Sequence, residues 1–228
     1  ALVLQQCERF ALARQGYASQ ERVRTRPLDL DGYAVQLQCN PARLRSSTAR
    51  VDPGSVSARP CFLCPGSLPP GQRALQYGPD LLILVNPYPV APEHLTIPAA
   101  SHIPQRLDRY LETLLRLAAD LSPRYTVLYN GPRCGASAPD HLHFQAVPAD
   151  FLPLDRDFAA LAARHGTPVW PAGGERAGAR ATAGAGATAG PLATAAVRGT
   201  VLGTLACPCV ALEGDDAASL AASARWLL

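Results

Sequence analysis

The chain of 228 residues contains no lysine and no methionine, and a bias in base composition explains this double absence better than function does. Every basic residue is therefore an arginine, whose rigid guanidinium group suits phosphate oxygens. The formal net charge is only +3. Spread over this length, that charge is too small to predict a nucleic acid as partner.

Long apolar runs are also missing. Because no 18 consecutive residues are apolar, we expect no segment that spans a membrane. The first ten residues lack the charged-then-apolar layout of a secretory signal. Without such a signal, the seven cysteines favour metal or redox use over a disulfide framework. We therefore expect a cytoplasmic protein that binds neither membranes nor nucleic acids.

Hydrophobic periodicity predicts helices and strands in an order typical of an α+β domain. Helices are expected over residues 1–15 and 106–121, the second with leucines largely on one side. Strands are expected over Tyr33–Gln38, Leu81–Val85, His94–Ile97, 125–130 and 141–147. This order predicts a mainly antiparallel sheet with flanking helices.

Composition divides the chain into three parts. Residues 1–165 are expected to form the main domain. Residues 166–190 are expected to form a flexible linker, because from Pro171 to Gly190 the sequence collapses to alanine, glycine and threonine. Residues 191–228 read as a strand, an acidic turn and a helix that stops at the chain end without a cap. We interpret this last piece as a truncated part of a second unit.

Cys61 and Cys64 form a C-x-x-C pair in the stretch "CFLCPG". Two thiolates at this spacing can hold one Zn²⁺, which needs two further ligands from the five histidines of the chain. A redox pair and coincidence are the alternatives, although no strand-then-helix pattern surrounds the pair as in thioredoxin-like proteins. The pair alone leaves both alternatives open.

The stretch "HLHFQ" places His141, His143 and Gln145 at alternate positions. In a strand these three side chains share one face, and Leu142 and Phe144 share the other. The Cα atoms of the two histidines would lie about 6.6 Å apart, which suits one anchored and one reactive imidazole better than two ligands of one ion. A neutral imidazole, with an unperturbed pKa of about 6.5, is a competent nucleophile. Two ordinary buried or edge histidines are the plain alternative.

The same stretch resembles the H-x-H-x-Q signature of the transferase branch of the histidine-triad superfamily. That branch includes galactose-1-phosphate uridylyltransferase, diadenosine-tetraphosphate phosphorylases and GDP-L-galactose phosphorylase. "CFLCPG", "NPYPVAPEHLTIP" and "YNGPRCGASAPDHLHFQA" extend the resemblance from Pro60 to Pro148. A bacterial group of uncharacterised proteins is similar over the same block. The resemblance implies a histidine-triad-like fold.

The resemblance also implies residue roles. His143 would attack the α-phosphorus and become nucleotidylated, and Gln145 would hydrogen-bond a non-bridging phosphate oxygen. A structural Zn²⁺ would be held by Cys61, Cys64, His102 and His141. In "APDH" an extra residue separates the proline from the histidine, unlike in the uridylyltransferases, and the plant-type phosphorylases lack an equivalent of His102.

The loop from Asn130 to Ser137 supplies the candidate phosphate-binding groups. Its backbone amides and the Ser137 hydroxyl suit an anion, and Arg133 could pair with a phosphate. An exposed arginine on an ordinary turn is the alternative for Arg133. Asn86 could contact nucleotide or simply form an Asn-Pro turn. The predicted substrate-binding residues are Asn86, Asn130, Arg133, Gly135 and Ser137, whereas His94 is expected to pack and His165 to end a helix.

Glutamine at position 145 cannot titrate, so it cannot shuttle a proton to water or to a poor leaving group. We therefore expect a nucleotidyltransferase or phosphorylase that takes a nucleoside monophosphate from a nucleotide sugar or dinucleoside polyphosphate. The acceptor would be phosphate or a sugar phosphate, and a homodimer would suit a family that shares sites between units. A nucleotide hydrolase on the same fold, or a zinc-stabilised nucleotide-binding protein without turnover, are the alternatives.

Overall fold

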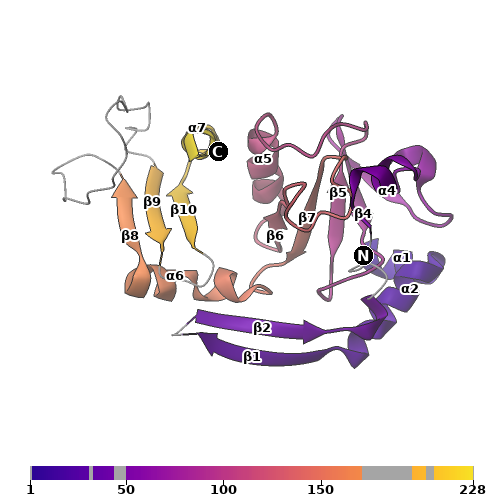
Figure 1. Ribbon diagram of the computed structural model, residues 1–228, viewed down its shortest axis with the longest axis horizontal. Coiled ribbons are helices and arrows are strands. Elements are labelled where there is room, and N and C mark those ends of the chain that lie inside the picture. The colour runs from indigo at the N-terminus through magenta and orange to yellow at the C-terminus, as the bar shows by residue number, and fades with distance from the viewer. Residues whose placement is uncertain (1, 31–32, 44–49, 171–196, 204–207, 228) are drawn as a thin grey trace.

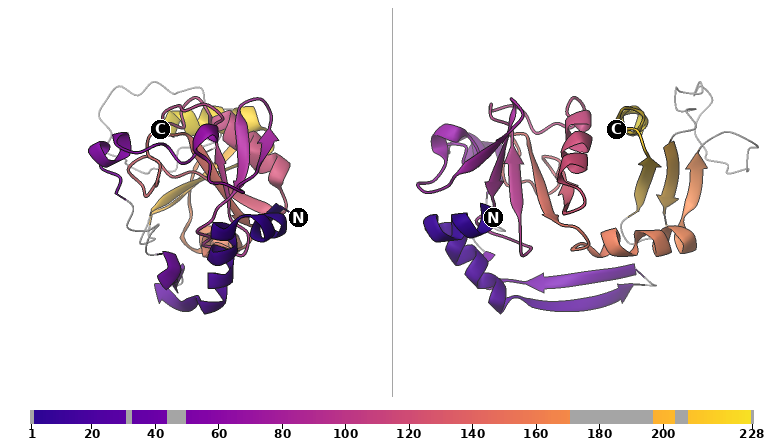
Figure 2. Two further views of the ribbon diagram at one scale, coloured as in Figure 1. Left: turned by 90° about the vertical axis from the view of Figure 1, so that its right-hand side faces the viewer. Right: turned by 180° about the vertical axis from the view of Figure 1, so that it is seen from behind.

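The computed structural model describes residues 2–30, 33–43, 50–170, 197–203 and 208–227. Two lobes stand side by side above a long two-stranded ribbon (Figure 1). The larger lobe contains a five-stranded sheet in the order β3-β4-β5-β7-β6, and the smaller lobe a three-stranded sheet in the order β10-β9-β8. The ribbon, β1–β2, runs beneath both lobes, as the view from behind also shows (Figure 2).

The strands of the larger sheet are β3 (Ala74–Tyr77), β4 (Leu81–Val85), β5 (Leu95–Pro98), β6 (Tyr125–Leu128) and β7 (His143–Pro148). The helices of this lobe are α1 (Leu2–Arg9), α2 (Ala11–Ala18), α4 (Pro53–Ser57) and α5 (Leu111–Leu121), with short 3-10 turns at η1 (Ser19–Arg22), η2 (Pro41–Arg43) and η3 (Pro65–Ser67). Every strand pairing among the described residues is antiparallel. The predicted α+β class with a mainly antiparallel sheet is confirmed.

The register of β5 and β7 assigns one face of the sheet to the core and the other to polar side chains. Leu95 and Ile97 lie opposite Ala146 and Phe144, and all four are buried in the main hydrophobic cluster with Leu117 of α5. Because side chains alternate along a strand, the opposite face carries Thr96 beside Gln145, and Pro98 beside His143.

The smaller lobe is built from β8 (Thr167–Trp170), β9 (Val197–Leu202), β10 (Cys209–Gly214), α6 (Pro153–His165) and α7 (Ala217–Leu227). Leu161 of α6 and Leu202 of β9 form its small buried cluster. Where one strand, an acidic turn and a helix were predicted at the end of the chain, the structure has two strands, β9 and β10, before α7. Of the predicted linker, residues 167–170 form β8, and residues 171–190 lie outside the described residues.

Several predicted boundaries shift for local reasons. The first helix is interrupted at Phe10, and the helix expected from residue 106 begins at Leu111, because residues 108–110 form a turn. The strand expected from residue 141 begins at His143, since the amide of Leu142 donates to the carbonyl of Ile103. His141 therefore lies before the strand and not on its polar face. No described helix has the length and apolarity needed to cross a bilayer.

The ribbon strand β1 (Arg24–Leu30), which we did not predict, pairs with β2 (Tyr33–Cys39) along its whole length. The 3-10 turn η1 and the strand β2 form hydrogen bonds with the loop that joins β4 to β5. Gln20 and Gln38 donate side-chain hydrogen bonds to the carbonyls of Pro89 and Val90 at 2.7 and 2.9 Å. Gly16 of α2 also packs against this loop, and a Cβ atom there would lie 2.0 Å from the carbonyl oxygen of Pro87.

Candidate active site and metal centre

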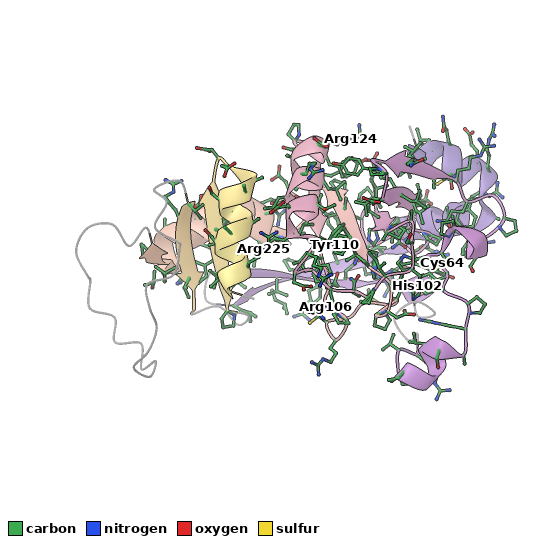
Figure 3. The ribbon with its side chains drawn as sticks, turned by 90° about the horizontal axis from the view of Figure 1, so that it is seen from above. Cys64, His102, Arg106, Tyr110, Arg124 and Arg225 are labelled. Carbon is green, nitrogen blue, oxygen red and sulfur yellow. The ribbon has the colours of Figure 1, made fainter. Side chains whose placement is uncertain are left out.

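Four predicted ligands, Cys61, Cys64, His102 and His141, come together near the end of β5 and the start of β7, although they lie up to 80 residues apart in sequence. Their ligand atoms all lie within 4.8 Å of one another. Sγ of Cys61 is 3.2 Å from Nδ1 of His141, and Sγ of Cys64 is 3.3 Å from Nδ1 of His102. Figure 3 shows Cys64 and His102 adjacent, seen from above.

The hydrogen bonds of the two imidazoles leave the correct nitrogen atoms free for a cation. Nε2 of His141 donates to the carbonyl of Ala99 at 2.8 Å, so its Nδ1 carries a lone pair toward the thiols. Nε2 of His102 lies 3.3 Å from a carboxylate oxygen of Asp140, the arrangement that orients metal-bound histidines in many proteins. Both lone pairs therefore point into the same space.

The donor set fits a tetrahedral ion. With metal–sulfur bonds of about 2.3 Å and metal–nitrogen bonds of about 2.0 Å, neighbouring ligand atoms should be roughly 3.5 Å apart. The sulfur–nitrogen separations of 3.2, 3.3 and 3.6 Å are close to this value. Burial raises the pKa of the Cys61 thiol, and a bound cation would counteract that effect because it stabilises the thiolate. These residues could hold a metal ion.

His143, the predicted nucleophile, is the first residue of β7 and is only 6% exposed. Its Nδ1 lies 2.8 Å from the carbonyl oxygen of His141, which cannot donate, so Nδ1 carries the proton and Nε2 the lone pair. Among the described residues Nε2 has no hydrogen-bond partner, so its lone pair is not used within the protein. Burial also lowers the pKa of His143, which favours the neutral imidazole.

Gln145 lies two residues further along the same face, and its amide is fixed from both sides. Its Oε1 is 2.8 Å from Nε2 of His94, and its Nε2 donates to Oδ1 of Asn130 at 2.8 Å. The amide of Val90 donates to Nδ1 of His94 at 3.3 Å, so the proton of that imidazole sits on Nε2. One N–H of the Gln145 amide is left over for a ligand.

The sequence predicts only a packing role for His94, but the structure places its ring against Gln145. Burial lowers the pKa of His94 to about 4, with a smaller contribution from the charge of Arg43. The imidazole is therefore neutral near pH 7. No spacing along the sequence connects His94 with Gln145. The signal that could have found it is the pairing of β5 with β7, which aligns Thr96 with Gln145.

Of the other predicted binding residues, only Asn130 contacts the side chain of Gln145. Both ends of the Asn86 side-chain amide are hydrogen-bonded within the protein, since Nδ2 donates to Thr96 of β5 and Oδ1 accepts from the amide of Tyr88. Asn130 contacts Gln145 and donates to the carbonyl of Cys134. Arg133 is exposed, and Gly135 has a φ of +85° that favours glycine. The carbonyl of Ser137 accepts from Arg59 at 2.7 Å, which ties the loop to the segment before Cys61.

A family described as "Domain of unknown function (DUF4922)" matches residues 2–148. The chain belongs to this DUF4922 family. The matched part of the DUF4922 chain includes the four clustered cysteines and histidines as well as His94, His143 and Gln145, whereas the smaller lobe lies beyond it. No curated protein matches the chain.

Among solved structures, the DUF4922 chain is similar to histidine-triad proteins. A histidine triad protein from Clostridium difficile is 19% identical with a TM-score of 0.30, covering 41% of this chain and 90% of that one. A HIT family hydrolase from Legionella pneumophila Philadelphia 1 is 21% identical with a TM-score of 0.31, covering 41% and 96%. Yeast Ap4A phosphorylase Apa2 is 19% identical with a TM-score of 0.38, covering 67% and 50%.

Two hollows of the DUF4922 chain lie away from these residues. One of about 700 Å³ is lined at the base of the ribbon by residues 21–24 and 39–42. Another of about 320 Å³ is lined by Ile103, Pro104, Arg106, Asp108, Arg109 and Tyr110. Neither is lined by His143 or Gln145, so size alone does not identify the site. The fixed tautomers and the polar chain around Gln145 are the more specific indicators.

Proposed function

We propose that the chain is a nucleotidyltransferase of the histidine-triad transferase branch that forms a covalent nucleotidyl intermediate on His143. The observation that carries the proposal is the bond from Nδ1 of His143 to the carbonyl of His141. This bond fixes the tautomer in which Nε2 carries the lone pair, as a nucleophile requires. Gln145 lies two residues further along the same strand face, and one N–H of its side-chain amide has no partner among these bonds.

In the first step Nε2 of His143 attacks the α-phosphorus of a nucleotide sugar or dinucleoside polyphosphate. A phosphorus–nitrogen bond forms, and the bond from phosphorus to the bridging oxygen breaks, so the leaving group departs as a phosphate anion. In the second step an oxygen of inorganic phosphate or of a sugar phosphate attacks the same phosphorus, and the phosphorus–nitrogen bond breaks. His143 then regains its starting state.

Gln145 supports transfer to an anionic acceptor over hydrolysis. The amide can donate to a non-bridging oxygen as negative charge develops there, which lowers the barrier of both steps. It cannot take a proton from water, and neither can the neutral His94 that donates to it. Phosphate esters and inorganic phosphate need no such proton transfer, because they leave and attack as anions.

The metal in this proposal is Zn²⁺, held by Cys61, Cys64, His102 and His141. When bound, it would supply a fixed positive charge and a cross-link between three segments of the chain. The chain's own residues do the chemistry. His141 contributes through its main chain, because its carbonyl accepts the Nδ1 proton of His143. For the phosphates we propose Asn130, Arg133, Gly135 and Ser137 in the loop before β7, and for the nucleotide a contact with Asn86.

The test is the intact mass of the protein after incubation with single nucleotides and no acceptor. Using GDP-hexose, UDP-hexose and a diadenosine polyphosphate in turn, we expect one of them to add the mass of one nucleoside monophosphate. Addition of phosphate should remove the adduct. His143→Ala should never gain it, whereas His165→Ala, a change on α6 of the smaller lobe, should behave as the wild type. An unmodified wild-type protein across the whole panel would contradict the proposal, and steady release of monophosphate without phosphate would indicate a hydrolase.

A further inference from the structure

We infer that Gln105 is a positioning residue that sets His143 relative to Gln145 in the proposed reaction. Gln105 lies on the loop between β5 and α5 and is only 2% exposed. Its Oε1 accepts from the main-chain amide of His143 at 2.7 Å. Its Nε2 donates to the carbonyl of Asn130 at 2.7 Å and to that of His143 at 3.2 Å.

The strand register explains why a side chain is needed here. In an antiparallel sheet the main-chain groups of successive residues point to opposite neighbouring strands. The carbonyl of Leu142 accepts from the amide of Ala99 on the β5 side, so the amide and carbonyl of His143 point toward β6. The pairing of β6 with β7 ends at Leu128 and Gln145, so Asn130 would be the next partner of His143.

The main chains of His143 and Asn130 are not hydrogen-bonded to each other in the β6–β7 ladder. The side-chain amide of Gln105 lies between them and bonds to both. The side chain takes the place of a peptide group: it accepts where a carbonyl would and donates where an amide would. It thereby satisfies main-chain groups of His143 and Asn130 that would otherwise be unpaired, which is unfavourable away from water. Tyr129 holds the main chain of Gln105 in place, because its hydroxyl donates to the carbonyl of Gln105 at 3.0 Å.

The consequence concerns the relative placement of two groups. Gln105 holds the main chain of His143, whose ring would attack phosphorus, and the main chain of Asn130. The side chain of Asn130 accepts from Gln145, whose amide would bind the phosphoryl oxygen. One buried amide therefore sets the separation of nucleophile and donor while touching no reacting atom. In enzymes, a misplacement of about 1 Å can cost on the order of 100-fold in rate.

The chain offers a matched control in Gln6. This glutamine is 1% exposed, accepts from the amide of Arg73 at 2.9 Å and donates to the carbonyl of Gly71 at 3.5 Å. It joins α1 to the segment before β3, away from β7. Gln105→Leu and Gln6→Leu each remove one buried amide that bridges main-chain groups, so a purely structural role should give both variants the same phenotype.

The first readout needs no substrate and so stands even if the proposed function is wrong. Nitrogen-15 spectra of the imidazoles report which ring nitrogen is protonated. For the wild type and Gln6→Leu we expect His143 protonated at Nδ1 with a lone pair on Nε2. For Gln105→Leu we expect the His143 signals to move toward the tautomer mixture of a free imidazole while those of His94 stay unchanged. Unchanged His143 signals in a folded Gln105→Leu protein would overturn the inference.

The second readout rests on the proposed function and is the rate of nucleotidyl adduct formation per folded molecule. We expect the maximal rate constant of adduct formation to fall on the order of 100-fold in Gln105→Leu, with the half-saturating substrate concentration nearly unchanged, and no such fall in Gln6→Leu. Equal losses in both variants would also overturn the inference. If Gln105→Leu fails to fold, Gln105→Glu serves, because it keeps the acceptor for His143 and loses both donated bonds. It should then show an intermediate rate, and a wild-type rate would count against the inference.

Discussion

His94 is predicted to make the stability of the protein depend on pH in a way that one substitution removes. Its ring is 3% exposed, and both nitrogen atoms are used by neighbours in the neutral form. A second proton would face the N–H of Val90 and lie near the charge of Arg43. These effects lower the pKa of His94 from 6.5 to about 4.

The direction and the size of this pH dependence of the free energy of unfolding follow from proton linkage. Between pH 4 and pH 6.5 the unfolded chain binds a proton at His94 that the folded chain does not, so the free energy of unfolding falls as the pH falls. At about 1.4 kcal/mol for each tenfold change in affinity, the full effect below pH 4 is about 3 kcal/mol. Between pH 7 and pH 5 it amounts to about 2 kcal/mol.

The assay is urea unfolding of the wild type and of His94→Gln at pH 7 and at pH 5. His141 and His143 also have pKa values lowered by burial, but both are present in both proteins. The difference between the two pH slopes therefore isolates His94. We expect the wild type to lose about 2 kcal/mol more than His94→Gln on acidification. Equal losses would show that His94 is not held neutral by its surroundings, and the account of the Gln145 amide would lose its main support.

Three further predictions use the same site and its borders. Cys64→Ser should abolish a stoichiometric metal content and lower the Tm, measured by elemental analysis and calorimetry; a metal-free but equally stable wild type would contradict this. Gln145→His, by adding a group that can shuttle protons, should raise the release of nucleoside monophosphate into water relative to phosphate, and an unchanged ratio would contradict the role given to Gln145. Arg225→Ala removes an exposed ion pair with Glu112 and should cost at most about 1 kcal/mol of stability, with the adduct rate unaffected; a slower adduct would link the smaller lobe to the site.

The parts of the fold that depend on local patterns could be predicted from the sequence. Residues Leu81–Val85 form a continuous apolar run between turn signals, and β4 has these same bounds. The alternation over residues 33–38 likewise marks most of β2. In contrast, β1 contains a proline, an aspartate and two arginines and is largely exposed, so no apolar face marked it. It is a strand because β2 pairs with it, which is a tertiary effect.

The candidate site divides in the same way. The sequence was sufficient to predict His143 and Gln145 as a pair, because residues two apart in a strand share a face in any fold. It could not nominate His94 or Gln105, because their contacts depend on where the β5–β7 and β6–β7 pairings begin and end. His141 is the instructive case: the alternation placed it on the strand face, but its amide is bonded to the carbonyl of Ala138 in a turn before the strand.

The tight approach of α2 to the β4–β5 connection has a consequence for how the chain can vary. Position 16 has no room for even a methyl group unless Pro87 retreats, and Pro87 is three residues from Val90, whose N–H fixes the ring of His94. An alanine at position 16 would therefore force a shift in the β4–β5 connection, which also holds the imidazole that contacts Gln145. Variation in the first helices should be read for its effect on reactivity as well as on folding.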